Sequence, residues 1–88
     1  MKLIDGLILH DVGGEHMVVA TGEAAKKFNG MIRNNETAHF IMQQMLEDTT
    51  EEAVVEKVLS VYEADREVVA KSVRSVVEQL RQAGLLDE

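Results

Sequence analysis

The pattern of apolar and polar residues changes about a third of the way along the chain. Two short runs rich in branched apolar residues, "LIDGLILHD" from Leu3 and "HMVVAT" from His16, are typical of β-strands. Between them, Gly13 and Gly14 predict a tight hairpin turn, because glycine adopts positive φ without steric cost. After the polar connection "GEAAKK", the run "FNGMIR" from Phe28 predicts a third strand. The first third of the chain is therefore predicted to form a small sheet.

The rest of the chain shows the spacing of helices. Asn35 is a favourable N-cap for "ETAHFIMQQMLED", and Asp65 for a last helix that ends before Gly84. Thr49 and Glu52 form a capping box that opens a middle helix. Apolar residues expected to face the core recur at helical spacing: Ala38, Ile41, Met42 and Met45; Val54, Val55, Val58 and Leu59; and Val69, Val73, Val76, Leu80 and Ala83. We expect Leu85 and Leu86 to fold back onto this core.

The order of these elements predicts the fold class. Strands that come first and helices that follow, without alternation, are typical of an α+β protein. We expect a winged-helix-like arrangement of a three-stranded antiparallel sheet followed by three helices, in one domain over residues 1–88.

The composition narrows the choice of partners and location. A formal net charge of −7 argues against nucleic acid and against an anionic membrane surface, because both need clustered cations. No apolar run approaches the ~20 residues that cross a bilayer, and the N-terminus is a poor signal peptide. The absence of cysteine suits a reducing compartment. We expect a cytoplasmic protein with an aliphatic core.

The chain shows no constellation that indicates catalysis. No GxSxG elbow or singled-out pair of carboxylates is present, and two glycines are too short for a phosphate loop. His10, Asp11 and His16 could converge across the hairpin and bind a metal, although exposed turn residues are the simpler interpretation. His39 is expected at the surface or its boundary. We therefore predict no enzyme, no catalytic residue, no metal and no cofactor.

Three cations lie on the last predicted helix, Lys71, Arg74 and Arg81. In a winged helix they would belong to a DNA-recognition helix, but three cations are a weak footprint in an acidic protein. They are also explained as a solvated face on which Glu67 and Glu78 provide ion pairs. A third interpretation places them along a groove beside the sheet, where they would meet an acidic peptide. A free sheet edge can bind such a peptide as an added strand.

The chain from about residue 3 to residue 86 resembles the PqqD family of small peptide chaperones, the recognition elements of ribosomally made, post-translationally modified peptides. The resemblance lies in the "NET" that opens the first helix at Asn35, the "T-EE-V…L…Y-AD" run from Thr50 to Asp65, and the "V…L…GLL" ending. It implies a winged-helix-like fold of three strands and three helices without enzymatic activity. It further implies a protein that holds the leader of a precursor peptide and presents it to a modifying enzyme, often a radical S-adenosylmethionine (radical SAM) enzyme. The alternative is a winged-helix regulator that binds nucleic acid.

The resemblance also implies a site. The leader would add to the third strand and lie in the groove between that strand and the third helix. The peptide-binding residues implied are Gly30, Met31, Ile32 and Arg33 on the strand, and Lys71, Arg74 and Arg81 on the helix. The chain departs from the family pattern twice: Asn34 replaces an apolar residue, commonly Leu, and Met42 replaces an aromatic. Both departures predict looser packing at the joint between strand and helix.

Overall fold

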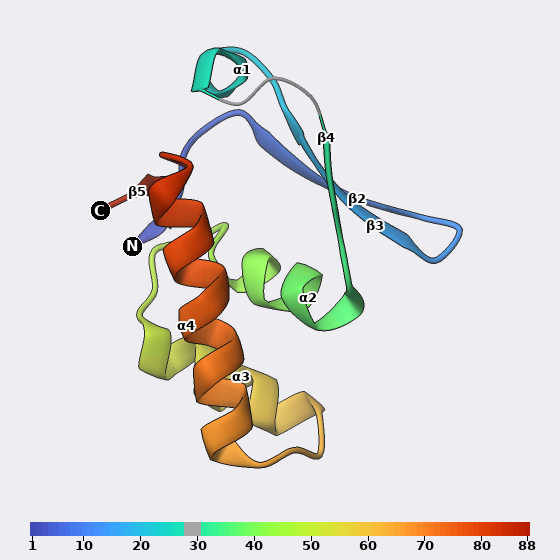
Figure 1. Ribbon diagram of the computed structural model, residues 1–88, viewed down its shortest axis with the longest axis vertical. Helices are drawn as coiled ribbons and strands as arrows, with labels where there is room; N and C mark the ends of the chain where they lie inside the picture. The colour runs from blue at the N-terminus through green and yellow to red at the C-terminus, as the bar shows by residue number, and fades with distance from the viewer. Residues whose placement is uncertain (28–30) are drawn as a thin grey trace.

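A computed structural model describes residues 1–27 and 31–88, with the backbone alone described for residues 31–33. The elements in chain order are β1 (Lys2–Leu3), β2 (Leu7–Val12), β3 (Glu15–Ala20), α1 (Ala24–Lys27), β4 (Met31–Asn34), α2 (Glu36–Gln44), α3 (Glu51–Val61), α4 (Arg66–Gln82) and β5 (Leu86–Asp87) (Figure 1). The α+β class is confirmed, with a three-stranded antiparallel sheet ahead of the three longer helices. The comparison with a winged helix holds only loosely.

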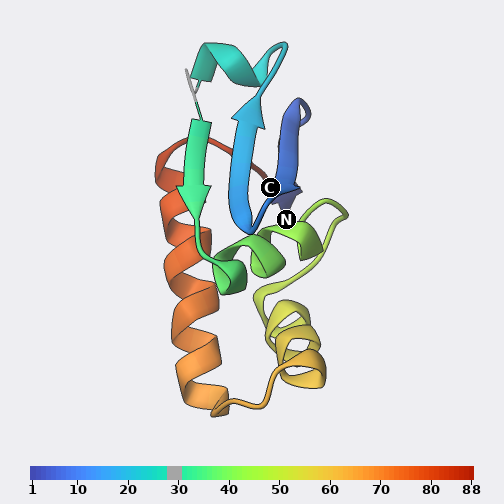
Figure 2. The same cartoon turned by 90° about the vertical axis from the view of Figure 1, so that its right-hand side faces the viewer.

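The main sheet has the strand order β2–β3–β4, with β3 in the centre (Figure 2). Gly13 and Gly14 have φ of 58° and 82° and close the β2–β3 hairpin, as predicted. Strand β4 runs antiparallel to β3, and its last residue pairs with His16. A second, two-stranded pairing of β1 with β5 joins the two ends of the chain, which the sequence did not predict.

Two segments of the first third differ from the expectation. The first predicted strand is divided into β1 and β2 at Gly6, whose φ is 95°. A side chain at Gly6 would meet the carbonyl oxygen of Thr21 at 2.3 Å, so the position requires glycine. The segment expected to be a polar connection contains the short helix α1, in which Ala24 is fully buried.

The helix ends follow capping chemistry. Asn35 accepts a hydrogen bond at 2.8 Å from the backbone N–H of the third residue of α2, and Asp65 accepts one at 2.9 Å from the second residue of α4. Both predicted caps are confirmed, as is the positive φ of Gly84 after α4. The predicted cap of α3 was wrong by one residue: Thr50, not Thr49, accepts the N–H of the third residue of that helix at 3.1 Å.

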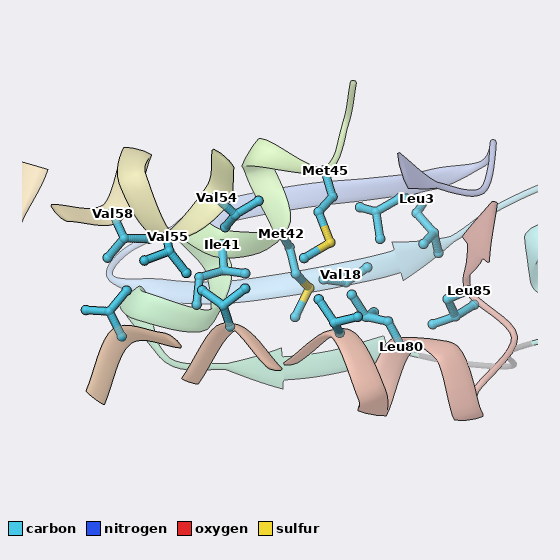
Figure 3. Packing of buried hydrophobic residues seen from close by; sticks show 14 of the residues in the cluster. Leu3, Val18, Ile41, Met42, Met45, Val54, Val55, Val58, Leu80 and Leu85 are labelled. Carbon is cyan, nitrogen blue, oxygen red and sulfur yellow. The ribbon is translucent and has the colours of Figure 1, made fainter. Parts of the chain in front are cut away.

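The core lies between the sheet and the three longer helices and is aliphatic (Figure 3). Its buried apolar side chains are Leu3, Leu7, Val18, Ala24, Ile41, Met42, Met45, Val54, Val55, Val58, Val69, Val73, Val77, Leu80 and Leu85. The expected stripe of α4 is confirmed at Val69, Val73 and Leu80. Val76 packs against the core but is only partly buried, the fully buried Val77 was not predicted, and Ala83 is exposed. Leu85 and Leu86 do fold back, the second pairing with Leu3. None of the helices in the described residues is long and apolar enough to cross a membrane.

His39 corrects another expectation, because its side chain is buried, with 3% of its surface exposed. Its ring lies 4.9 Å from that of His16 on β3, and neither Nδ1 has a hydrogen-bond partner among the described residues. Burial lowers the pKa of His39, repulsion from His16 lowers it further, and Asp11 opposes both. Burial between α2 and β3 therefore favours the uncharged form of the His39 imidazole.

The two departures from the family pattern are in contact. The side-chain amide of Asn34 donates a hydrogen bond to the sulfur of Met42 at 3.6 Å. The amide oxygen of Asn34 is buried, and the described residues provide it with no donor. Within the part of the chain that the structure describes, the desolvation of this buried acceptor is therefore not offset by a hydrogen bond.

Substitutions at the two adjacent asparagines are predicted to change the free energy of unfolding in opposite directions. Asn34→Leu is expected to raise the free energy of unfolding by roughly 1 kcal/mol, because it removes the unpaired acceptor. Asn35→Ala is expected to lower it by about 1 kcal/mol, because α2 loses its cap. Urea denaturation of both variants measures these changes. An Asn34→Leu protein less stable than the wild type would show that the contact with Met42 outweighs the unpaired acceptor.

The buried histidine predicts a loss of stability in mild acid. The folded state lowers the pKa of His39 below its ordinary value of 6.5, so the unfolded chain binds the proton more readily. The stability that the uncharged His39 contributes is fully present above pH 6.5 and is lost as the pH falls below that value. We expect the melting temperature to fall between about pH 7.5 and about pH 5.5, and to fall less in His39→Gln. Circular dichroism melts test this, with the exposed His10→Gln as control; an unchanged slope in His39→Gln would contradict it.

Candidate peptide-binding groove

Strand β4 forms one edge of the main sheet. It pairs with β3 on one side, and no strand among the described residues pairs with its other side. Because successive N–H and C=O groups of a strand point alternately to its two sides, half of those on β4 are available to another strand. The predicted site residues Met31, Ile32 and Arg33 belong to this strand, whereas Gly30 lies outside the described residues.

A groove opens beside the point where β4 ends. It has a volume of about 380 Å³ and lies between the beginning of α2 and the middle of α4. We call it the α2–α4 groove, and it is lined by Asn35, Thr37, Ala38 and Ile41 on one side and by Lys71, Ser72, Ser75, Val76 and Gln79 on the other. The groove therefore begins at Asn35, the residue that follows the open strand.

One stripe of α4 provides the wall of this groove. Ser72, Ser75 and Gln79 recur at spacings of three and four, beside the buried valines of the same helix. Serines at these positions leave room for a peptide backbone and offer hydroxyl groups as donors and acceptors. These residues were not predicted from the sequence, although a stripe of small polar side chains next to an apolar stripe was the available signal.

Lys71 is the predicted cation that the structure brings to the groove. Its side chain is exposed, and the described residues contain no salt bridge to it. Of the described residues that line the α2–α4 groove, Lys71 alone is charged. Its ammonium group can therefore meet a carboxylate or a backbone carbonyl of a molecule in the groove.

The other two predicted cations do not line the groove. Nε of Arg74 forms a salt bridge with Glu51 of α3 at 3.1 Å. Arg81 binds Glu88 through two hydrogen bonds of 3.0 and 2.7 Å and also pairs with Glu78, and its guanidinium holds the pKa of Glu88 below the usual range. Their binding role remains a prediction. With both arginines engaged by glutamates, the nucleic-acid alternative gains no support from α4.

The histidines of the hairpin do not assemble the metal site considered from the sequence. Asp11 and His16 are paired across β2 and β3, with Oδ1 and Nδ1 3.5 Å apart. His10 is the neighbour of Asp11 on the strand and therefore points to the opposite face of the sheet. Within the part of the chain that the structure describes, no group of three potential ligands is placed to hold a metal.

Two solved structures are similar to this chain over nearly their whole length. TbiB1 in complex with the TbiA(β) leader peptide has a TM-score of 0.75 and 18% sequence identity, over 99% of this chain and 95% of that one. A lasso peptide synthetase B1 complexed with the leader peptide has a TM-score of 0.70 and 18% identity, over 96% and 93%. At this identity the likeness establishes the fold. No curated protein matches the chain.

The comparison with protein families identifies the group. The model for coenzyme PQQ synthesis protein D, PqqD, matches residues 7–86, from the first strand of the main sheet to the beginning of β5. The match includes the open edge on β4, both walls of the α2–α4 groove and the cap residues that the sequence analysis singled out. The chain therefore belongs to the PqqD family.

Proposed function

We propose that this protein is a non-catalytic chaperone that binds the leader segment of a ribosomally made precursor peptide and presents it to a modifying enzyme. The leader adds to the open edge of β4 as a further strand, and the part that passes the end of β4 enters the α2–α4 groove. This chain supplies recognition, and the partner enzyme supplies the chemistry. A radical SAM enzyme is our prediction for that partner.

The observation that carries the proposal is that the groove begins at Asn35, the residue that follows the open strand β4. A strand edge binds any extended peptide through backbone hydrogen bonds, which give affinity without selecting a sequence. The groove beside the end of that edge offers side-chain contacts, which can select one. Membership of the PqqD family and the two leader-peptide complexes of the same fold support this function.

Strand addition is tested by backbone methylation of the peptide. The precursor peptide encoded beside this chain's gene is synthesised with a single N-methyl group moved along its leader, and binding is measured by calorimetry. Methylation at alternate residues should weaken binding by about two- to tenfold, because only every second N–H faces β4 and each hydrogen bond contributes roughly 0.5–1.5 kcal/mol. Intervening positions are the internal control. Binding without this alternation would contradict strand addition, and no binding by any form would contradict the function itself.

The position of Lys71 predicts that it contributes more than the other two cations of α4. Lys71→Gln should weaken peptide binding by about two- to fivefold at low salt, and less at high salt, because its charge is unpaired and exposed. Arg74→Gln and Arg81→Gln are matched controls in charge change and should have smaller effects, since both arginines are paired with glutamates. Calorimetry at two salt concentrations measures all three. Equal effects would favour a general charge effect of α4 over a contact at Lys71.

A further inference from the structure

A second hollow extends the α2–α4 groove toward the turn between α3 and α4. It has a volume of about 290 Å³ and shares Thr37, Ile41 and Ser72 with the groove. Its other lining residues come from the end of α3, the turn and the beginning of α4, and they are Val58, Tyr62, Glu63, Ala64, Val68 and Val69. We call this hollow the turn pocket.

The turn pocket is mainly apolar and has fixed walls. Val58 and Val69 are buried, so they form a packed floor. Tyr62 is held in place by an edge-to-face contact with Phe40, with ring centroids 5.3 Å apart. A cavity of roughly 150 Å³ is enough to hold benzene, so the turn pocket has room for a large apolar side chain.

An exposed apolar residue stands at the turn pocket. Val68 belongs to the first turn of α4 and is 61% exposed, although it is one of the lining residues. It precedes Ser72 and Ser75 on the stripe of α4 that forms the wall of the α2–α4 groove. The stripe is therefore polar along the groove and apolar at the turn pocket.

The two charged residues that line this continuous hollow, in the described part of the chain, have opposite signs. Of the described residues that line the turn pocket, Glu63 alone is charged, and its side chain is exposed. In the same way, Lys71 is the one charged residue among the described residues that line the α2–α4 groove. A peptide that occupies both would meet a cation, then an apolar hollow, then an anion.

We propose that the turn pocket is a specificity subsite for the same peptide, an inference that rests on the proposed function. The peptide segment that leaves the end of β4 passes Lys71 and inserts one large apolar side chain between Tyr62 and Val68. The charges predict an acidic residue on the strand side of this apolar residue and a basic residue on its other side, beside Glu63. A sequence order of acid, large apolar residue and base is thus expected next to the strand-forming segment.

The test compares two exposed valines. Val68→Glu places a carboxylate at the turn pocket, and a glutamate in the first turn of a helix is compatible with folding. Val61→Glu is the matched control, because Val61 is 56% exposed and does not line the turn pocket. The probe is the fluorescein-labelled leader of the precursor peptide encoded beside this chain's gene, and binding is followed by fluorescence anisotropy after both variants are shown to fold.

We expect Val68→Glu to weaken binding by roughly tenfold or more, because its carboxylate opposes the burial of a large apolar side chain in the turn pocket. Val61→Glu should leave affinity unchanged. In the leader, one apolar residue outside the segment with alternating sensitivity to N-methylation should be the residue that enters the turn pocket. Changing it to Ala should weaken binding to the wild-type protein. The same peptide change should weaken binding to Val68→Glu only slightly further. Glu63→Lys should weaken binding of a leader that carries a basic residue next to this apolar residue.

Three results would overturn the inference. If both valine variants bind like the wild type while the N-methyl alternation persists, strand addition stands and the turn pocket is not part of the site. If the wild type self-associates and only Val68→Glu prevents it, without an effect on peptide affinity, the turn pocket is a contact between copies of this chain. If the wild type binds no leader at all, the proposed function fails and this inference fails with it.

Discussion

The arrangement of the site depends on a single residue between β4 and α2. Asn35 is all that separates the last residue of the strand from the first residue of the helix. Its side chain accepts the N–H of Ala38 at 2.8 Å, and its carbonyl accepts that of His39 at 2.9 Å. With the strand held by β3 and the helix start held by these two hydrogen bonds, the joint has little freedom. The open edge and the groove beside it therefore keep one relative position.

Helix α4 serves both the fold and the groove because it carries two neighbouring stripes. Val69, Val73 and Val77 are buried against α2 and α3, which fixes the helix in a core that contains no buried Phe or Tyr among the described residues. The adjacent stripe, with Ser72 and Ser75, faces the groove. A change in the buried stripe would move the wall of the groove, so the shape of the groove depends on the aliphatic packing beneath it.

Local chemistry made much of the fold predictable from the sequence. Asn35 and Asp65 were identified as caps because their side chains satisfy N–H groups within the same few residues. The errors occur where distant contacts decide. Periodicity placed the partly buried Val76 in the core stripe and missed the fully buried Val77, since it gives a face only to within about one residue. The burial of His39 depends on His16 across the fold, and the groove depends on how α4 crosses α2. No pattern within a short segment of the sequence indicates the burial of His39 or the groove.

The net charge of the protein and the charge in the groove act on an approaching peptide at different distances. A charge of −7 favours the approach of basic segments and disfavours acidic ones, but salt screens this effect beyond about 8–10 Å. Within the groove, the unpaired Lys71 reverses the local preference. A leader that is basic overall but carries one acidic residue near its strand-forming segment satisfies both conditions. Because an added strand would bond to β4 through its backbone, under the proposed function the discrimination between leaders would fall to these few side chains, and a small acidic protein could select a peptide without a large interface.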